Sequence, residues 1–210
     1  RNMEINQIEL SEGNLSELKD VYQRLSTDFP ANELKDYSHF QFLLADEKYK
    51  LLWAKQQEEI VGYALTYEFE HLPAIWLDYM AIHKHYRNTG YGSLFFQKIT
   101  QSKRDGYIGT FVEVEIPGED QDSREQQIRR INFYERLGAR RLNIPYKLPT
   151  NDGGFPMYLY FRPSANVHRL PKEQIEAAIE EVFQFIHSDV IDKEAILQEF
   201  SPFIGDEYFS

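Results

Sequence analysis

The chain has 210 residues, of which 42% are hydrophobic and 15% aromatic, and 34 acidic residues stand against 23 basic ones. This length and apolar content favour one globular domain, with or without an extension, over a disordered chain. The net charge of −11 argues against nucleic acid and anionic lipid as partners, since both require a basic face. We therefore expect binding neither to nucleic acid nor to a membrane.

Cysteine is absent from the sequence. Its absence excludes disulfides, thiolate metal ligands and a thiol nucleophile. No apolar run approaches the roughly 18 residues of a membrane span. The opening residues Arg1–Glu4 lack the apolar core of a signal peptide. We expect a cytoplasmic protein.

Apolar spacing in the first 82 residues predicts a strand, two helices and then three consecutive strands. Leu15, Leu18 and Leu25 fall on one helical stripe, and Asn14 is placed as its N-terminal cap. Strands that follow one another so closely favour antiparallel pairing. The expected elements are a strand at 3–10, helices near 15–25 and 37–46, and strands at 49–56, 60–69 and 74–82.

After residue 82 the pattern changes to alternating helices and strands, which favours a parallel crossover. The expected elements are a helix from about 91 to 99, a strand at 110–116, an acidic loop at 119–123, a helix at 124–137 and strands near 140–144 and 157–161. Gly138 is placed to end the second of these helices. The order predicts an α/β or α+β fold with a mixed, mostly antiparallel sheet flanked by helices.

The last part of the chain, after Pro163, has a different character. Apolar residues at helical spacing predict an amphipathic helix over 171–186, and a shorter helix is expected over 193–200. A segment of this size is too small to fold alone, so it must pack on the rest of the chain or on a second subunit. We expect a domain at 3–163 and a helical extension at 164–210, with a homodimer as the alternative use of the extension.

The segment Arg87-Asn88-Thr89-Gly90-Tyr91-Gly92 joins a strand rich in branched residues to a helix. The first amide groups of a helix have no intrahelical acceptor, and the helix dipole is positive there. Glycine lets an anion approach the backbone closely, and an arginine can add a charged contact. The pattern predicts a pyrophosphate cradle. It is neither a Rossmann fingerprint nor a P-loop, because the third glycine and the Gly-Lys-Ser/Thr are missing.

This segment resembles the Arg/Gln-x-x-Gly-x-Gly/Ala signature of the GCN5-related N-acetyltransferases (GNAT). The segment Phe133-Tyr134-Glu135-Arg136-Leu137-Gly138-Ala139 is similar to that family's second landmark, and both occur in the family's order. The resemblance covers residues 3–162. It implies a GNAT-type sheet, acetyl-CoA as co-substrate and no metal.

The resemblance also implies a role for each matching residue. Acetyl-CoA would lie between the strands at 74–82 and 110–116, and the amide of Met80 would stabilise an oxyanion. Tyr134 would protonate the leaving thiolate, and Glu113 would act as general base. The expected cofactor-binding residues are Met80, Ile82, Arg87, Asn88, Thr89, Gly90, Tyr91 and Gly92.

Chemistry supports a carboxylate base, because an alkyl amine with a pKa near 10.4 must lose a proton before it attacks. Glu113 and Glu115 are two apart on one strand and are expected to share a face, with Asp78 as a third carboxylate; either glutamate can be the base. His83 and His85 lack a third metal ligand and are expected at the surface.

We expect transfer of acetyl to a primary amine by direct attack in a ternary complex. A small cationic amine is favoured, and a peptide amine is also open. Two alternatives remain, a transferase that uses another acyl-CoA and a degenerate module that binds acyl-CoA without turnover.

Overall fold

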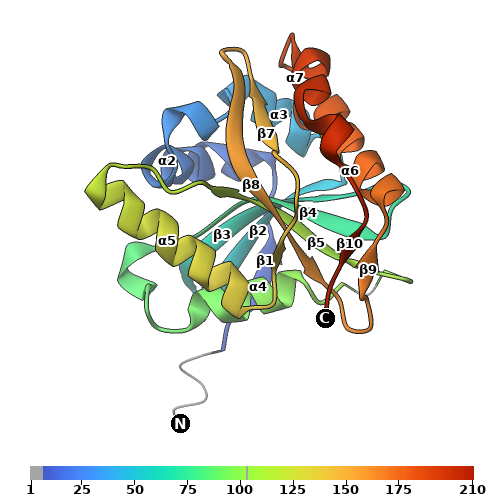
Figure 1. Ribbon diagram of the computed structural model, residues 1–210. Helices are drawn as coiled ribbons and strands as arrows, with labels where there is room; N and C mark the ends of the chain where they lie inside the picture. The colour runs from blue at the N-terminus through green and yellow to red at the C-terminus, as the bar shows by residue number, and fades with distance from the viewer. Residues whose placement is uncertain (1–6, 103) are drawn as a thin grey trace. The chain divides into compact units, whose positions relative to one another are not determined.

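The computed structural model describes residues 7–102 and 104–210 (Figure 1). They form two compact units. The first contains residues 7–68 and 77–102, and the second contains residues 69–76 and 104–210. Strand β4 (Ala74–Ile82) contributes its first three residues to the second unit and its remainder to the first.

In the first unit the strand order is β1-β2-β3-β4. Strand β1 (Glu9–Glu12) pairs antiparallel with β2 (Tyr49–Gln56), and β2 pairs antiparallel with β3 (Glu59–Glu68). The unit also contains the short helix η1 (Leu15–Glu17) and helices α2 (Leu18–Asp28) and α3 (Tyr37–Leu44). Asn14 and Glu17 form a capping box, which fixes the start of this helical segment. The core of the first unit includes Leu18, Val21, Leu25, Leu51, Ala64 and Leu65.

Beyond β4 the first unit continues through the short helix η3 (Lys84–Tyr86) into helix α4 (Tyr91–Ile99). Four apolar side chains of α4 are buried: Tyr91, Phe95, Phe96 and Ile99. This burial fixes one face of the helix, so the loop at its N-terminal end is held at a defined place within the unit.

In the second unit β5 (Gly109–Glu115) pairs antiparallel with β8 (Gly153–Pro163), in a register that sets Glu113 opposite Leu159. Strand β8 also pairs with β6 (Arg140–Arg141) and β7 (Lys147–Thr150). Helix α5 (Gln121–Arg136) lies between β5 and β6 in the chain. Gly138, at φ +96°, ends α5 in the left-handed conformation that its position predicts.

The C-terminal segment consists of β9 (Arg169–Leu170), α6 (Lys172–Phe185), α7 (Lys193–Phe200), the short helix η4 (Ser201–Phe203) and β10 (Glu207–Tyr208). Figure 1 shows α7 beside the β7–β8 hairpin. Lys147 of β7 and Glu199 of α7 form an ion pair at 2.6 Å. The ring of Phe209 stacks on Phe161 of β8 at 5.7 Å. The segment therefore packs on the second unit. The expected boundary at 163/164 stays a prediction, and so does a homodimer.

The structure confirms the predicted sheet class and most elements, with four corrections. Among the described residues, the first strand, expected at 3–10, is β1 at Glu9–Glu12, so Gln7 and Ile8 precede it. Helix α5 begins at Gln121, inside the expected acidic loop, because the carboxylate of Asp120 accepts a hydrogen bond from the amide of Ser123 and caps the helix. The strand expected at 140–144 is reduced to two residues, and β7, β9 and β10 were missed. Residues 3–6 of the first expected strand lie outside the described residues. Across 7–102 and 104–210, no helix is both long and apolar enough to cross a membrane.

Candidate functional site

In the first unit, the segment Arg87–Gly92, here called the anion loop, joins the end of β4 to α4 by way of η3. Two of its residues have left-handed backbone angles, Asn88 at φ +64° and Gly90 at φ +87°. The hydroxyl of Thr89 donates to the carbonyl of Tyr86, which ties the loop back to η3. Helix α4 begins directly after Gly90, so its first amide groups, which have no acceptor within the helix, lie at the end of this turn.

Gly90 is the N-cap of α4, and the space beside it is open. A Cβ atom built at this glycine has no heavy atom within 4 Å. Glycine is therefore favoured at this position by the left-handed backbone angle and not by a lack of space for a side chain. Open space in front of a helix N-terminus, with the positive end of the dipole behind it, suits a phosphate group. The loop thus has the features of an anion-binding site.

The guanidinium of Arg87 is held by two groups of the first unit. Its Nε donates to the carbonyl of Ile82 at 3.1 Å, and its Nη2 lies 3.6 Å from Oδ1 of Asp28, the last residue of α2. Asp28 also accepts a hydrogen bond from the hydroxyl of Tyr63 at 2.7 Å. The Arg87 side chain is half exposed, and its five N–H donors exceed these two contacts. It can therefore also bind an anion.

The end of β4 holds the two backbone positions predicted to bind pantetheine, Met80 and Ile82, and both residues are partly exposed. Gly62 of β3 lies close to Ala81 and Ile82: a Cβ at Gly62 would stand 2.8 Å from the carbonyl oxygen of Ala81 and 2.8 Å from Cδ1 of Ile82. Glycine at this position lets the two strands approach closely. The Asp78 carboxylate accepts from the hydroxyl of Tyr49 at 2.6 Å, within the first unit.

Burial raises the pKa of Asp78 above its usual value. Three neighbours in the first unit oppose this shift: the charge of Lys35, the hydrogen bond from Tyr49 and the charge of His39. Asp78 is therefore a carboxylate that burial biases toward its protonated form.

In the second unit, Tyr134 lies on α5 and is only 4% exposed. Burial raises the pKa of Tyr134 to about 12, and the positive charge of Arg130 offsets a small part of the shift. The phenol therefore keeps its proton at neutral pH.

Glu113 and Glu115 of β5 have different partners. The hydroxyl of Tyr146 donates to Oε2 of Glu113 at 2.6 Å. The amide of Gln127 donates to Oε2 of Glu115 at 3.0 Å, and Arg130 lies 3.9 Å from its Oε1. Glu115 thus belongs to an ion pair with α5, whereas Glu113 is bonded to a neutral phenol.

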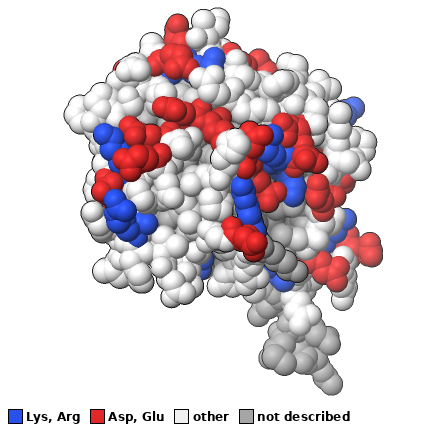
Figure 2. Space-filling view, turned by 90° about the vertical axis from the view of Figure 1, so that its right-hand side faces the viewer, with Lys and Arg blue, Asp and Glu red and all other residues white. Residues whose placement is uncertain are grey.

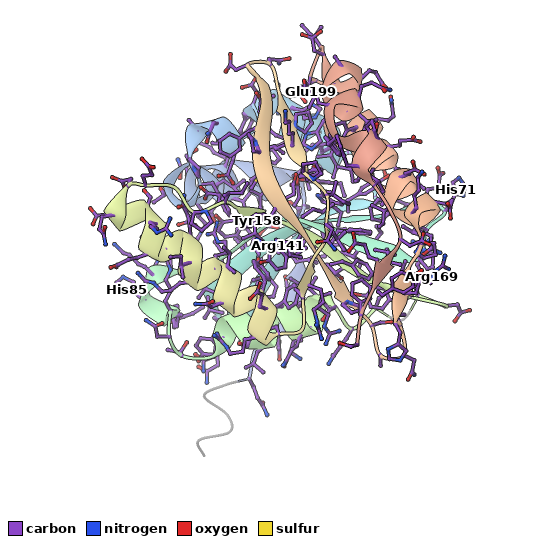
Figure 3. The ribbon with its side chains drawn as sticks, in the orientation of Figure 1. His71, His85, Arg141, Tyr158, Arg169 and Glu199 are labelled. Carbon is purple, nitrogen blue, oxygen red and sulfur yellow. The ribbon has the colours of Figure 1, made fainter. Side chains whose placement is uncertain are left out.

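The second unit also contains a cation–aromatic contact between Arg141 and Tyr158. The guanidinium carbon of Arg141 lies 4.3 Å from the ring centroid of Tyr158, and Figure 3 shows the two labelled side chains next to each other. The contact occupies Tyr158, so this tyrosine belongs to the packing of β8 with its neighbours.

Among residues 7–102 and 104–210, no group of three or more His, Cys, Asp and Glu residues is placed to hold a metal ion. The rings of His83 and His85 lie 5.0 Å apart. Burial and the neighbouring His85 lower the pKa of His83, so its neutral form is favoured.

Two residues at these sites escaped prediction from the sequence. Tyr146 is buried, at 1% exposure, and no pattern in the sequence indicated that its hydroxyl bonds Glu113. Asp28 ends a helix far along the chain from Arg87, and only the folded unit brings the two together. Because a buried tyrosine hydroxyl needs a hydrogen-bond partner, a buried Tyr146 would have indicated that some polar group lies next to it.

Comparison with known proteins places the chain in a family. The model of the acetyltransferase (GNAT) family matches residues 18–139, more than half of the chain. The protein of Bacillus subtilis (strain 168) named "Putative acetyltransferase YjbC" is 26% identical over 175 residues, which are 80% of this chain and 81% of that protein.

Solved structures share the fold. "Putative acetyltransferase from GNAT family from Bacteroides thetaiotaomicron" superposes with a TM-score of 0.67 at 21% identity, over 85% of this chain and 97% of that one. The ribosomal-protein-S18-alanine N-acetyltransferase of Escherichia coli gives 0.53 at 18%, over 77% and 99%. Arabidopsis thaliana NAA60 in complex with acetyl-CoA gives 0.56 at 15%, over 75% and 98%. The chain therefore belongs to the GNAT family and is an acyltransferase.

Proposed function

We propose that the enzyme transfers an acetyl group from acetyl-CoA to a primary amine by direct attack of the amine in a ternary complex. One observation carries this proposal. The anion loop contains Gly90, the N-cap of α4, which has a left-handed angle and no heavy atom within 4 Å of a Cβ built there, so a diphosphate has room beside it. This loop is also the segment that matches the signature of the GNAT family, which supports acetyl-CoA as the co-substrate.

We assign the diphosphate to the backbone of the anion loop and to the side chain of Arg87. The pantetheine arm is assigned to the backbone of Met80 and Ile82, at the partly exposed end of β4. The amide of Met80 is the proposed donor to the developing oxyanion, where a fixed backbone N–H costs no reorganisation during reaction. Bound acetyl-CoA supplies an activated acyl group, so the protein needs no nucleophile of its own.

Tyr134 is the proposed acid. A phenol with a pKa of about 12 stays protonated across the neutral range and can donate toward the leaving sulfur. An ordinary thiol has a pKa of about 8.5, so complete proton transfer from this phenol is uphill. We therefore expect Tyr134 to stabilise the leaving sulfur mainly by donating a hydrogen bond and less by transferring its proton completely.

Glu113 is the proposed base, because the amine is mostly protonated at neutral pH and must lose a proton before attack. The contacts favour Glu113 over Glu115. The Arg130 ion pair and the Gln127 hydrogen bond engage Glu115, and Glu113 accepts a hydrogen bond from the neutral hydroxyl of Tyr146.

The acceptor is proposed to be a small cationic amine. The net charge is −11, and residues 164–210 alone hold ten acidic residues against three Lys and Arg. Figure 2 shows more acidic than basic side chains on the face that it draws. Such a surface attracts cations and raises their local concentration. A peptide amine is the second candidate, supported by the protein-directed activity in the name of the Escherichia coli structural neighbour.

The roles are tested by two variants measured against an amine panel. Glu113→Gln should remove the acidic limb of the pH–rate profile, and Tyr134→Phe should lower kcat with unchanged affinity for acetyl-CoA. Wild-type profiles in both would contradict the assignments. Binding of acetyl-CoA without thiol release for any amine would favour the non-catalytic reading, and faster release from a longer acyl-CoA would favour a different acyl donor.

A further inference from the structure

The hydrogen bond between Tyr146 and Glu113 joins the proposed base to residues outside the region matched by the family model. Tyr146 follows residue 139, where that match ends. Its hydroxyl lies 2.6 Å from Oε2 of Glu113, and its backbone carbonyl accepts from the amide of Met157 on β8. Both ends of the residue are therefore fixed within the second unit.

Rings from three elements surround the Tyr146 ring. The ring centroids of Phe200 on α7, Trp76 on β4 and Phe183 on α6 lie 5.2, 6.2 and 6.4 Å from it. Phe183 and Phe200 also contact each other at 6.0 Å. All four side chains are at most 1% exposed. A ring packed in this way has little freedom, so its hydroxyl has a defined position.

We propose that Tyr146 is a positioning residue for the general base Glu113, and that the C-terminal helices α6 and α7 hold it in place. The inference rests on the proposed function, in which Glu113 takes the proton of the amine. A donated O–H bond favours the ionised carboxylate, which is the form a base needs, and it fixes one carboxylate oxygen. A carboxylate fixed in this way can take the proton of the amine, directly or through water.

Charged groups around Glu113 bear on its titration. On its own strand lies Glu115, paired with Arg130 of α5. Opposite it on β8 stands the apolar Leu159. His187 at the end of α6 packs its ring against Phe183. The charged residues of α6 and α7 with assigned partners bond to other groups: Glu181 to the amide of Glu70, Glu194 to Gln184, and Glu199 to Lys147. The hydrogen bond from Tyr146 therefore bears directly on the titration of Glu113.

The test compares Tyr146→Phe with Tyr158→Phe in the full chain. Tyr146→Phe keeps the ring among its three neighbours and deletes the donor. The carboxylate then protonates more readily, so the acidic limb of the kcat/KM profile should move to higher pH by about one unit. The affinity for acetyl-CoA should not change. Tyr158→Phe keeps its contact with Arg141 and should leave the limb in place. An unmoved limb in a folded Tyr146→Phe variant would overturn the proposal.

A further pair of variants tests the role of the helices and separates this inference from the proposed function. Phe200→Leu loosens the packing of α7 on Tyr146 and should move the limb in the same direction by a smaller amount; no movement would refute the part assigned to α7. Glu113→Gln alone and with Tyr146→Phe should show the same rate, since both changes act through one group. If Glu113→Gln keeps the acidic limb, the proposed base is wrong; if only Tyr146→Phe fails to shift it, only the positioning role is wrong.

Discussion

The charge of a side chain at Gly90 should decide whether acetyl-CoA binds. Gly90 has φ +87°, and a Cβ there points into open space. Asparagine and aspartate tolerate the left-handed region better than other non-glycine residues, and they have nearly the same shape. Gly90→Asn and Gly90→Asp therefore differ chiefly in one negative charge beside the proposed diphosphate.

The size of the effect follows from the geometry. At a separation of about 5 Å and an effective dielectric constant of about 20, two unit charges of the same sign repel by about 3 kcal/mol. That energy is a loss of roughly 100-fold in affinity for Asp relative to Asn. Each substitution should cost about 1 kcal/mol of stability through backbone strain, so both variants should remain folded.

Calorimetric titration with acetyl-CoA and with free CoA measures the difference, and circular dichroism confirms that both variants are folded. The separation between Asp and Asn should shrink as salt rises, since exposed charges are screened. Equal affinities of the two variants at low salt would refute the placement of the diphosphate at the N-terminus of α4.

Three further predictions concern other contacts. Arg87→Ala should weaken acetyl-CoA binding by roughly 10- to 100-fold, as expected for loss of a charge-assisted hydrogen bond, and unchanged calorimetric affinity would exclude Arg87 from the cofactor site. Asp28→Asn should instead tighten binding by about 2- to 5-fold, because it removes the ion pair that competes for Arg87, while Asp20→Asn serves as a control on the same helix. Burial raises the pKa of Glu207, so its contribution to stability is present below its unfolded pKa and is lost as pH rises through the higher folded value. Glu207→Gln should therefore gain thermal stability relative to the wild type at pH 7 and not at pH 4; a gain of the same size at both would contradict this reading.

Local signals were sufficient to predict most of the fold. Strand β4 and helix α7 have the predicted bounds, because apolar spacing and flanking turn residues specify them. Strand β7 was missed because it contains Pro149 and only four residues, and it exists through its pairing with β8. Strands β9 and β10 consist of two residues each, so only their mutual pairing defines them.

The sites show the same division. The position of the anion loop before a helix could be predicted from consecutive residues, and the structure adds the left-handed angle of Gly90; its ligand stays a prediction. The partners of Glu113 and Glu115 could not, because spacing along β5 indicates a shared face and says nothing of Tyr146 or Arg130. The expectation that Asp78 joins the two glutamates stays a prediction; within its own unit its carboxylate accepts a hydrogen bond from Tyr49.

The central claim is acetyl transfer to an amine, and product identification tests it most directly. The enzyme is incubated with acetyl-CoA and a panel containing a polyamine, an aminoglycoside, free lysine and a short peptide, and the amines are examined by mass spectrometry. We predict that a cationic amine becomes acetylated in step with thiol release, and that Gly90→Asp abolishes both. Thiol release without any acetylated amine, or no product from an enzyme that binds acetyl-CoA tightly, would contradict the account.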